Sequence, residues 1–466
     1  MNNYIGLSQM IMIAELIIVL MLLLAARKRG SLTYPMLINA IILMGCIMRI
    51  GYTAYTPCVL RGHDLSTFSA DGYGKAGYIL GVISTGKLPS SYTGELYQQP
   101  LYYLLGALCG KILLFFNKNA SSYLVVNAAS VISCSASCLS MYIAKLIFFE
   151  LKITQRNTIY GMLIICFSPV FYLIGGRVGE DSLSALFVFS ALLVTLIWRR
   201  SPSWKTTIVL ALLYGFGMLV KISMAVPAVF TAIVFLIEIQ RNGIRTLRKV
   251  LVFAIISIPL GLSYSIRNFI LFGQEFTYVL EQPDYSPMYT GYLSYVRRFI
   301  LPDLASLLKS PFASPTDDFN LFTYLLKSEL FGEFSYEIWI GIPYVLLFLN
   351  FCLTVVCLVY SVIAISRFRI MKPSVSIWWL LLFVAFAAYS YLKYPFGCTM
   401  DCRYYVTIVL SKALILAQML DVNDRHKCHD QHQHDEALIL SRITRNGCVL
   451  FAVFSCIMFC FIKTSL

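Results

Sequence analysis

The sequence predicts an all-α, polytopic transmembrane protein with about twelve spans, within a range of about 11 to 13, and a region of extracytoplasmic interfacial helices. Of its 466 residues, 59% are hydrophobic and only 13% are charged, whereas a soluble domain carries about 25% charged residues. Apolar runs of about 20 residues recur along the chain, which is the length that a helix needs to cross the bilayer. A water-soluble protein is therefore excluded.

The apolar runs define the expected crossings in chain order. The first run, 5–25, has no basic region ahead of it and no Ala-x-Ala exit, so we expect a span and not a cleaved signal. The twelve expected crossings are 5–25, 34–52, 123–144, 159–174, 183–198, 208–220, 222–239, 250–271, 338–365, 377–392, 404–420 and 449–462.

Basic residues orient these crossings, because loops rich in Lys and Arg face the cytoplasm. Clusters lie at 27–29, 152–156, 199–200, 241–249, 367–372 and 425–445. A further apolar run, 101–116, is short and is interrupted by Gly106, Gly110 and Lys111. Counting it as a crossing would place the later clusters outside, so we expect an interfacial or re-entrant helix there.

This topology predicts one integral membrane domain over 1–466. It has large extracytoplasmic loops at 53–119 and 272–337, and a cytoplasmic His-rich loop at 421–446. The His-rich tract could bind a metal, but a solvated loop is the favoured interpretation. Topology also accounts for the net charge of +14, so we expect no nucleic-acid partner. Most of the 14 cysteines lie in apolar runs, and a disulfide between Cys398 and Cys402 is permitted but not required.

Four basic residues at the outer ends of spans are not explained by topology: Arg49, Lys221, Arg267 and Arg403. Charge within a bilayer is costly, although a long basic side chain near a helix end can reach the headgroups. For each residue alone, the two explanations weigh about equally. Four such residues near one leaflet favour a shared anionic ligand, and a lipid phosphate is the natural one.

Acidic residues occur on the same side. Asp64 follows the second span, and a catalytic or metal-binding role is favoured over a helix cap or a polar loop role. Asp181 is equally consistent with a site residue and with an N-cap, and Glu180 is interpreted as its neighbour. His63 could orient Asp64 or bind a metal or substrate, but an ordinary loop histidine is the default interpretation.

Two other polar groups have a favoured structural explanation. Asp71 and Lys75, four residues apart, are predicted to pair on the surface of an amphipathic helix over 68–80. Around Gln98 and Gln99, tyrosines suit the membrane interface, and sugar binding by aromatic rings and amides is the alternative. Pro100 can begin the helix that follows.

Together these motifs resemble the superfamily C glycosyltransferases, and most of all the group of protein O-mannosyltransferases and lipid A aminoarabinose transferases. The resemblance lies in the order of short motifs along most of the chain. These are Gly62-His63-Asp64, Gly86-Lys-Leu-Pro89, Pro100 to Tyr103, Ser168-Pro169, Asp181, Leu219-Val-Lys221, Arg267-Asn268 with Gly273, and Arg403-Tyr404.

The resemblance implies transfer of a sugar from a polyprenyl-phosphate donor, a membrane lipid, to an extracytoplasmic acceptor glycan, lipid or protein. It implies that Asp64 is the general base, that Asp181 organises the site, and that Lys221 holds the donor phosphate. We expect Arg267 and Arg403 to complete the phosphate site, and a multi-pass protein of the cell membrane with its active site outside.

Further substrate-binding candidates are His63, Gln98 and Gln99. The sequence departs from the family at Leu65, where a second acid is common, and at Gln98-Gln99, where the aminoarabinose enzymes have Glu-Lys. Sugar identity and metal use are therefore open, with a divalent cation as a candidate cofactor. The rival interpretation is a lipid or small-molecule transporter or flippase, which predicts charges at mid-bilayer and repeated halves.

Overall fold

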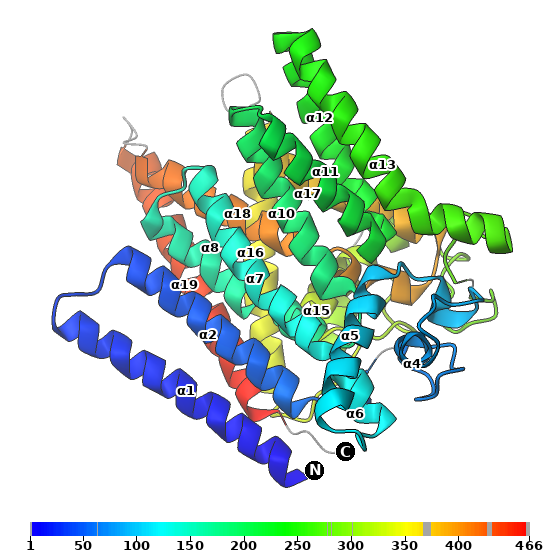
Figure 1. Ribbon diagram of the computed structural model, residues 1–466. Helices are drawn as coiled ribbons and strands as arrows, with labels where there is room; N and C mark the ends of the chain where they lie inside the picture. Colours follow the sequence, from blue (N-terminus) through cyan, green and yellow to red (C-terminus); the bar gives the residue numbers. More distant parts are fainter. Residues whose placement is uncertain are drawn as a thin grey trace. The chain divides into compact units, whose positions relative to one another are not determined.

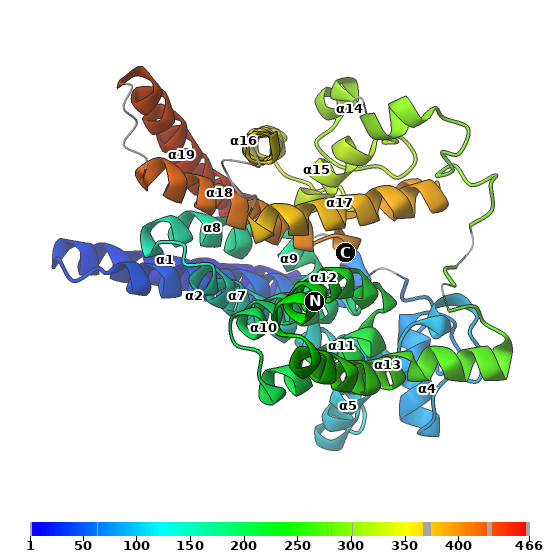
Figure 2. The same cartoon turned by 90° about the horizontal axis from the view of Figure 1, so that it is seen from above.

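The computed structural model describes residues 2–62, 64–276, 278–280, 282–300, 302–366, 374–425 and 431–462. These residues form helices joined by loops (Figures 1 and 2), and the β-contact recorded among them is an isolated bridge between Tyr289 and Phe396. The predicted all-α fold class is confirmed. The chain clusters into two compact units, here called unit 1 (Met1–Tyr55, Ala144–Leu173 and Pro283–Leu466) and unit 2 (Thr56–Ile143 and Ile174–Gln282).

Unit 1 contains the first two and the last six helices of the chain, together with α8 (Gln155–Phe167). In both views α18 lies beside α8, and α2 packs against α1 and α8. Its helices are α1 (Asn2–Lys28), α2 (Tyr34–Tyr55), α8 (Gln155–Phe167), α14 (Leu304–Lys309), α15 (Leu321–Phe331), α16 (Gly341–Ser366), α17 (Val375–Lys393), α18 (Thr407–Arg425) and α19 (Gln431–Phe461), with short turns at Val296–Ile300, Gly397–Met400 and Cys402–Tyr404.

Unit 2 contains the short helices of the first large loop and four long helices. Here α11 packs against α13 and α10, and α4 packs against α5. Its helices are α3 (Cys58–Arg61), α4 (Lys75–Thr85), the short helix η1 (Gly94–Tyr97), α5 (Leu101–Phe116), α6 (Ser122–Asn127), α10 (Asp181–Arg200), α11 (Trp204–Val220), the short helix η2 (Ile222–Met224), α12 (Ala225–Asn242) and α13 (Ile244–Phe272). Two helices, α7 (Ser130–Glu150) and α9 (Pro169–Gly175), contain a boundary between the units.

Within the described residues, nine helices are long and apolar enough to cross a membrane, and ten if α8 and α9 count as one bent span. The predicted crossings at 208–220 and 404–420 are the two without a counterpart in this set. They correspond to α11, an apolar helix of 17 residues, and to α18. The run predicted as an interfacial helix is α5, which is also a shorter apolar helix.

The His-rich segment predicted as a loop over 421–446 is largely helical, because α18 continues to Arg425 and α19 begins at Gln431. Its histidine side chains lie outside the described part of the chain. Cys398 and Cys402, whose pairing was left open, are both free cysteines.

The predicted span over 159–174 is interrupted by a bend of 44° between α8 and α9. Pro169 has no N–H, so it cannot bond to the carbonyl of Ile165 four residues earlier. Arg49 donates to that carbonyl from Nη2 (3.1 Å) and to the carbonyl of Cys166 from Nη1 (2.8 Å). Arg49 is fully buried and its guanidinium donates to carbonyls at the bend. The prediction that Arg49 helps to bind a lipid phosphate is therefore wrong.

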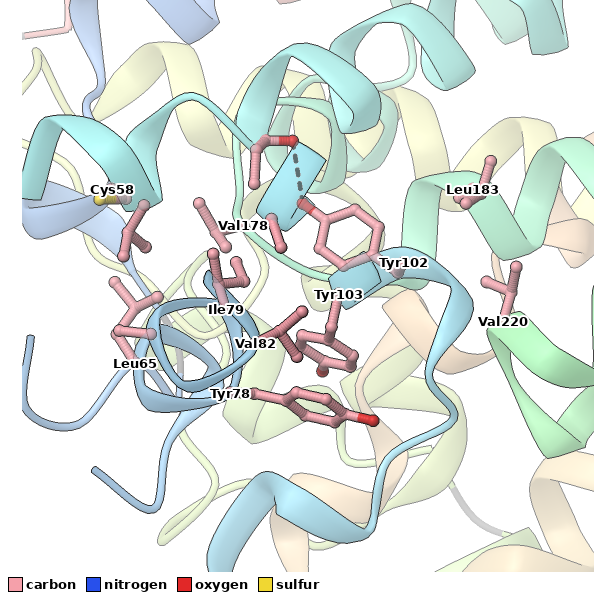
Figure 3. Close-up of a cluster of buried hydrophobic side chains, with 14 of the residues drawn as sticks. Cys58, Leu65, Tyr78, Ile79, Val82, Tyr102, Tyr103, Val178, Leu183 and Val220 are labelled. Atoms are coloured by element: carbon pink, nitrogen blue, oxygen red, sulfur yellow. Dashed lines mark hydrogen bonds between the residues drawn. The ribbon is translucent and has the colours of Figure 1, made fainter. Parts of the chain in front are cut away.

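A buried core in unit 2 supports the candidate site (Figure 3). The rings of Tyr78 from α4 and Tyr103 from α5 stack with their centroids 4.2 Å apart and their planes 4° from parallel. Beside them, the hydroxyl of Tyr102 donates to the carbonyl of Ala129 at 3.1 Å. The helix that follows Pro100 is thereby fixed against α4, with its polar tyrosine atoms facing defined partners.

Candidate functional site

The turn that carries Asp64 has an unusual backbone. Asp64 and Ser66 have φ of +57° and +56°, in the left-handed region that costs a non-glycine residue about 1–2 kcal/mol. The first N–H groups of a helix have no partner within it, and those of α4 bind this turn. The N–H of Lys75 donates to the carbonyl of Asp64 (2.9 Å), and that of Ala76 donates to the carbonyl of Leu65 (3.3 Å). The Asp64 side chain is exposed.

Glycines allow α4 to approach this turn closely. A side chain at Gly74 would collide with the carbonyl of Leu65, and one at Gly77 would collide with the carbonyl of Gly72. The start of α4 therefore packs backbone against backbone on the segment that carries Asp64.

Two lysines meet two adjacent acids at the start of α10. Lys75 Nζ lies 3.4 Å from Glu180 Oε2, and Lys221 Nζ lies 3.7 Å from Glu180 Oε1. Lys221 also donates to Asp181 Oδ1. The hydroxyl of Tyr103 donates to Glu180 Oε2 at 3.0 Å. Glu180 thus joins both lysines to the core of α4 and α5.

Helix dipoles support this arrangement. Asp181 lies in the first turn of α10, where the helix end is positive, and Lys221 caps α11, whose C-terminal end is negative. The N-cap of α10 is Glu180, whose side chain makes no capping hydrogen bond. The interpretation of Asp181 as an N-cap is therefore wrong, because Asp181 is already the first helical residue.

Lys75 is the electrostatic centre of the site. Its side chain is only 4% exposed, and burial alone would lower the pKa of its ammonium group. Four carboxylates outweigh this effect and raise the pKa of Lys75 above its ordinary value. In order of strength they belong to Glu180, Asp64, Asp181 and Glu95. The electrostatics therefore group Asp64, Glu180 and Asp181 around one ammonium, together with Glu95.

The two glutamates of the site have opposite pKa shifts. Burial raises the pKa of Glu180, but the nearby ammonium groups of Lys75 and Lys221 outweigh it, so the pKa is lowered overall. Burial also raises the pKa of Glu95, and here Lys75 compensates only in part. Glu95 is held by Gln98, whose amide donates to Glu95 Oε2 at 3.1 Å.

Arg267 joins the same unit through aromatic contacts. Its Nη2 donates to the carbonyl of Pro89 at 2.7 Å, and its guanidinium lies 5.5 Å from the ring centroid of Tyr264. The hydroxyl of Tyr78 donates to that of Tyr264 at 3.0 Å. Because Tyr78 stacks on Tyr103, a chain of contacts links Arg267 to Glu180.

The other predicted residues have separate surroundings. Gln99 is buried and donates to Ser265 Oγ at 3.2 Å. Arg403 belongs to unit 1, where its Nε lies 3.3 Å from Asp401 Oδ2. His63 lies outside the described residues. The roles predicted for these three residues stay predictions.

The pair predicted from two charged residues four apart is wrong. Asp71 and Lys75 do not form a helix-surface pair, because α4 begins only at Lys75. Asp71 is exposed and accepts a hydrogen bond from Ser69, whereas Lys75 is buried against Glu180. Glu180, interpreted from the sequence as a neighbour of Asp181, contacts Lys75, Lys221 and Tyr103. The sequence did contain one signal for a buried cation. In Gly74-Lys75-Ala76, the lysine stands between two small residues.

The arrangement fits a divalent cation poorly. In the described ranges, no group of three or more His, Cys, Asp or Glu residues is placed to hold a metal ion. The carboxylates at the start of α10 are already paired with the ammonium groups of Lys75 and Lys221. The candidate cation therefore stays a prediction, and no chemical step below depends on it.

Comparison with known proteins gives one family match and several structural likenesses. A search of the curated proteins found no significant match. The chain is similar to the crystal structure of the Archaeoglobus fulgidus oligosaccharyltransferase tethered to an acceptor peptide containing the NVT sequon (12% identity, TM-score 0.48, 92% of this chain and 56% of that chain). It is also similar to the archaeal oligosaccharyltransferase AglB from Archaeoglobus fulgidus in complex with an inhibitory peptide and a dolichol-phosphate (13% identity, TM-score 0.46, again 92% and 56%).

The chain thus spans little more than half the length of those archaeal enzymes. The family match covers a defined part of the sequence, residues 101–263, and includes Tyr103, Glu180, Asp181 and Lys221. This segment is similar to the family named dolichyl-phosphate-mannose-protein mannosyltransferase, and the match confirms the resemblance predicted from the motifs.

Proposed function

We propose that the protein is a membrane glycosyltransferase that moves a sugar from a polyprenyl-phosphate donor to an acceptor hydroxyl on the extracytoplasmic side, with Asp64 as general base. The observation that supports it is geometric: the Asp64 carbonyl accepts from the N–H of Lys75, whose ammonium lies against Glu180, which in turn neighbours Asp181 and Lys221. Several of these residues lie in the segment that matches a family named for lipid-linked sugar transfer.

The chemistry needs one proton acceptor and one anion-binding group. Asp64 takes the proton of the acceptor hydroxyl while its oxygen attacks the anomeric carbon opposite the phosphate. The bond from that carbon to the phosphate oxygen breaks, and its electron pair stays on the departing polyprenyl phosphate. The exposed side chain of Asp64 suits a base that must meet an acceptor. Basic groups stabilise the charge that develops on the phosphate.

Lys221 is better placed than Lys75 to bind a donor phosphate. The Lys221 side chain is 14% exposed, against 4% for Lys75. The Lys221 ammonium donates to Asp181 and lies 3.7 Å from Glu180 Oε1, so a phosphate bound there would share it with these two acids. Arg267 belongs to the same unit as Lys221.

The test is sugar transfer by the full chain reconstituted in liposomes with polyprenyl-phosphate mannose, the donor that the family name suggests. Asp64→Asn should lower turnover by about 10²–10⁴-fold, which is the usual contribution of a general base. Asparagine also tolerates the left-handed backbone, so the turn should persist. Asp71→Asn is the matched control, because Asp71 is an exposed acid in the same segment.

Two results would contradict the proposal. A folded Asp64→Asn protein with near-normal turnover would remove Asp64 from the mechanism. Movement of the lipid between leaflets, with no transfer from any defined polyprenyl-phosphate sugar, would favour the transporter interpretation.

A further inference from the structure

We propose that Lys75 is the positioning residue of this site, which holds the turn of Asp64 in register with Glu95 and Glu180. This inference rests on the proposed function, in which Asp64 is the general base. Lys75 acts through these carboxylates and does not itself contact the donor or the acceptor.

Lys75 and the nearby Tyr73 connect the start of α4 to three separate segments of unit 2. The backbone N–H of Lys75 fixes the Asp64 turn, and its ammonium lies against Glu180 at the start of α10. The third segment is η1, where the N–H of Glu95 donates to the carbonyl of Tyr73 at 2.7 Å, two residues before Lys75. The position of Asp64 relative to the other acids therefore depends on the start of α4.

The position of the Lys75 ammonium costs free energy unless the ammonium is paired with carboxylates. Lys75 is the first residue of α4, where the positive end of the helix disfavours a cation. It is also 97% buried, and burial penalises any charge that lacks a partner. A methyl group built on Gly179 would lie 3.2 Å from Lys75 Nζ, so the ammonium packs directly over the chain just before Glu180.

Four acidic side chains that act on Lys75 come from three segments of the candidate site. The turn supplies Asp64, η1 supplies Glu95, and α10 supplies Glu180 and Asp181. Around them lie Lys221, at the end of α11, and the Tyr103 hydroxyl from α5. The four carboxylates outnumber the two ammonium groups by two, and without Lys75 the excess would be three.

Removing Lys75 should therefore shift protons onto the remaining carboxylates, because a lost positive neighbour raises carboxylate pKa values. In liposomes, Lys75→Met should lower kcat and move the acid limb of the pH–rate profile upward by about 1–3 pH units. KM for the polyprenyl-phosphate donor should stay unchanged. Lys75→Arg, which retains the charge, should restore the profile in part, and Lys87→Met, a change at an exposed lysine after α4, should behave as wild type.

A merely structural role predicts a different result. Lys75→Met would then lower the melting temperature, while the folded fraction would keep the normal kcat and pH profile, and this result would overturn the inference. If Lys75→Met does not fold, Gly179→Ala provides the second test, because its methyl group presses on the ammonium. It should move the acid limb in the same direction by a smaller amount, and an unchanged limb would also overturn the inference.

The two proposals can fail separately. Full activity of Asp64→Asn would remove the general base, whatever Lys75 does. An inactive Asp64→Asn protein beside a Lys75→Met protein with wild-type kcat and profile would contradict only the role of Lys75. If Lys75 acts through Asp64, the losses in the double variant should be smaller than the sum of the single losses.

Discussion

Replacement of Lys221 by methionine is the sharpest test of the phosphate site. Met keeps the length and apolar character of the stem and removes the charge. If the Lys221 ammonium gives one hydrogen bond to the donor phosphate, its loss should cost about 1.5–3 kcal/mol of binding. This corresponds to a donor affinity about 10- to 150-fold weaker.

The same change also affects stability, and the structure shows how to separate the two effects. Glu180 would keep Lys75 as a partner, but Asp181 would lose the ammonium that binds it. Breaking a fully buried ion pair costs about 3–5 kcal/mol, and the positive end of α10 should recover about 0.3–1 kcal/mol of this. The double variant Asp181→Asn with Lys221→Met should regain stability without regaining donor affinity.

The assay is equilibrium binding of polyprenyl phosphate to the protein in nanodiscs, with the melting temperature of each variant measured on the same sample. Lys205→Met is the matched control, since Lys205 is an exposed lysine at the opposite end of α11. Unchanged affinity in a folded Lys221→Met protein would refute the reasoning, and Lys221 would then be only a counter-ion of Asp181.

Arg49→Met should lower the free energy of unfolding by about 1–3 kcal/mol, since the buried carbonyl of Ile165 loses this donor whereas that of Cys166 keeps the Tyr172 hydroxyl; an unchanged melting temperature would contradict this. Cysteines placed at positions 64 and 181 in a cysteine-light protein should both react with a membrane-impermeant reagent from outside, and labelling from opposite faces would refute the twelve-span topology. The lowered pKa of Glu180 means that its ionised form stabilises the fold above the ordinary value of 4.5, and that this contribution is lost as the pH falls through the lower folded value. Glu180→Gln should therefore flatten the acid limb of a plot of melting temperature against pH, and a limb as steep as that of wild type would argue against the ion pairs.

The sequence predicted the helices well because apolar length is a local property. The runs before Arg27 and after Gly341 became long helices, and Pro100 is the N-cap of α5, which begins at Leu101. The bend at Pro169 was not predicted. A proline in an apolar run is compatible with either a straight or a bent span, and the bend depends on Arg49, which is more than a hundred residues away in sequence.

The candidate site was predicted only in part, for a related reason. Lys75 and Glu180 meet across more than a hundred residues, so neither position signals its partner. The local rule for residues four apart gave a wrong pair for Asp71, since it assumed a helix before one begins. Motifs of the family pointed to Asp181 and Lys221, which do contact each other.

The left-handed turn at Asp64 and Ser66 implies a trade-off between robustness and catalytic performance. A glycine at position 66 would relieve the strain of that residue and should make the protein harder to unfold. It would also make the backbone beside Asp64 more flexible, so that the Asp64 carboxylate would adopt more orientations. Selection for heat resistance alone would therefore tend to replace the strained residues of this turn. If active relatives keep the turn, selection acts on the orientation of the Asp64 side chain.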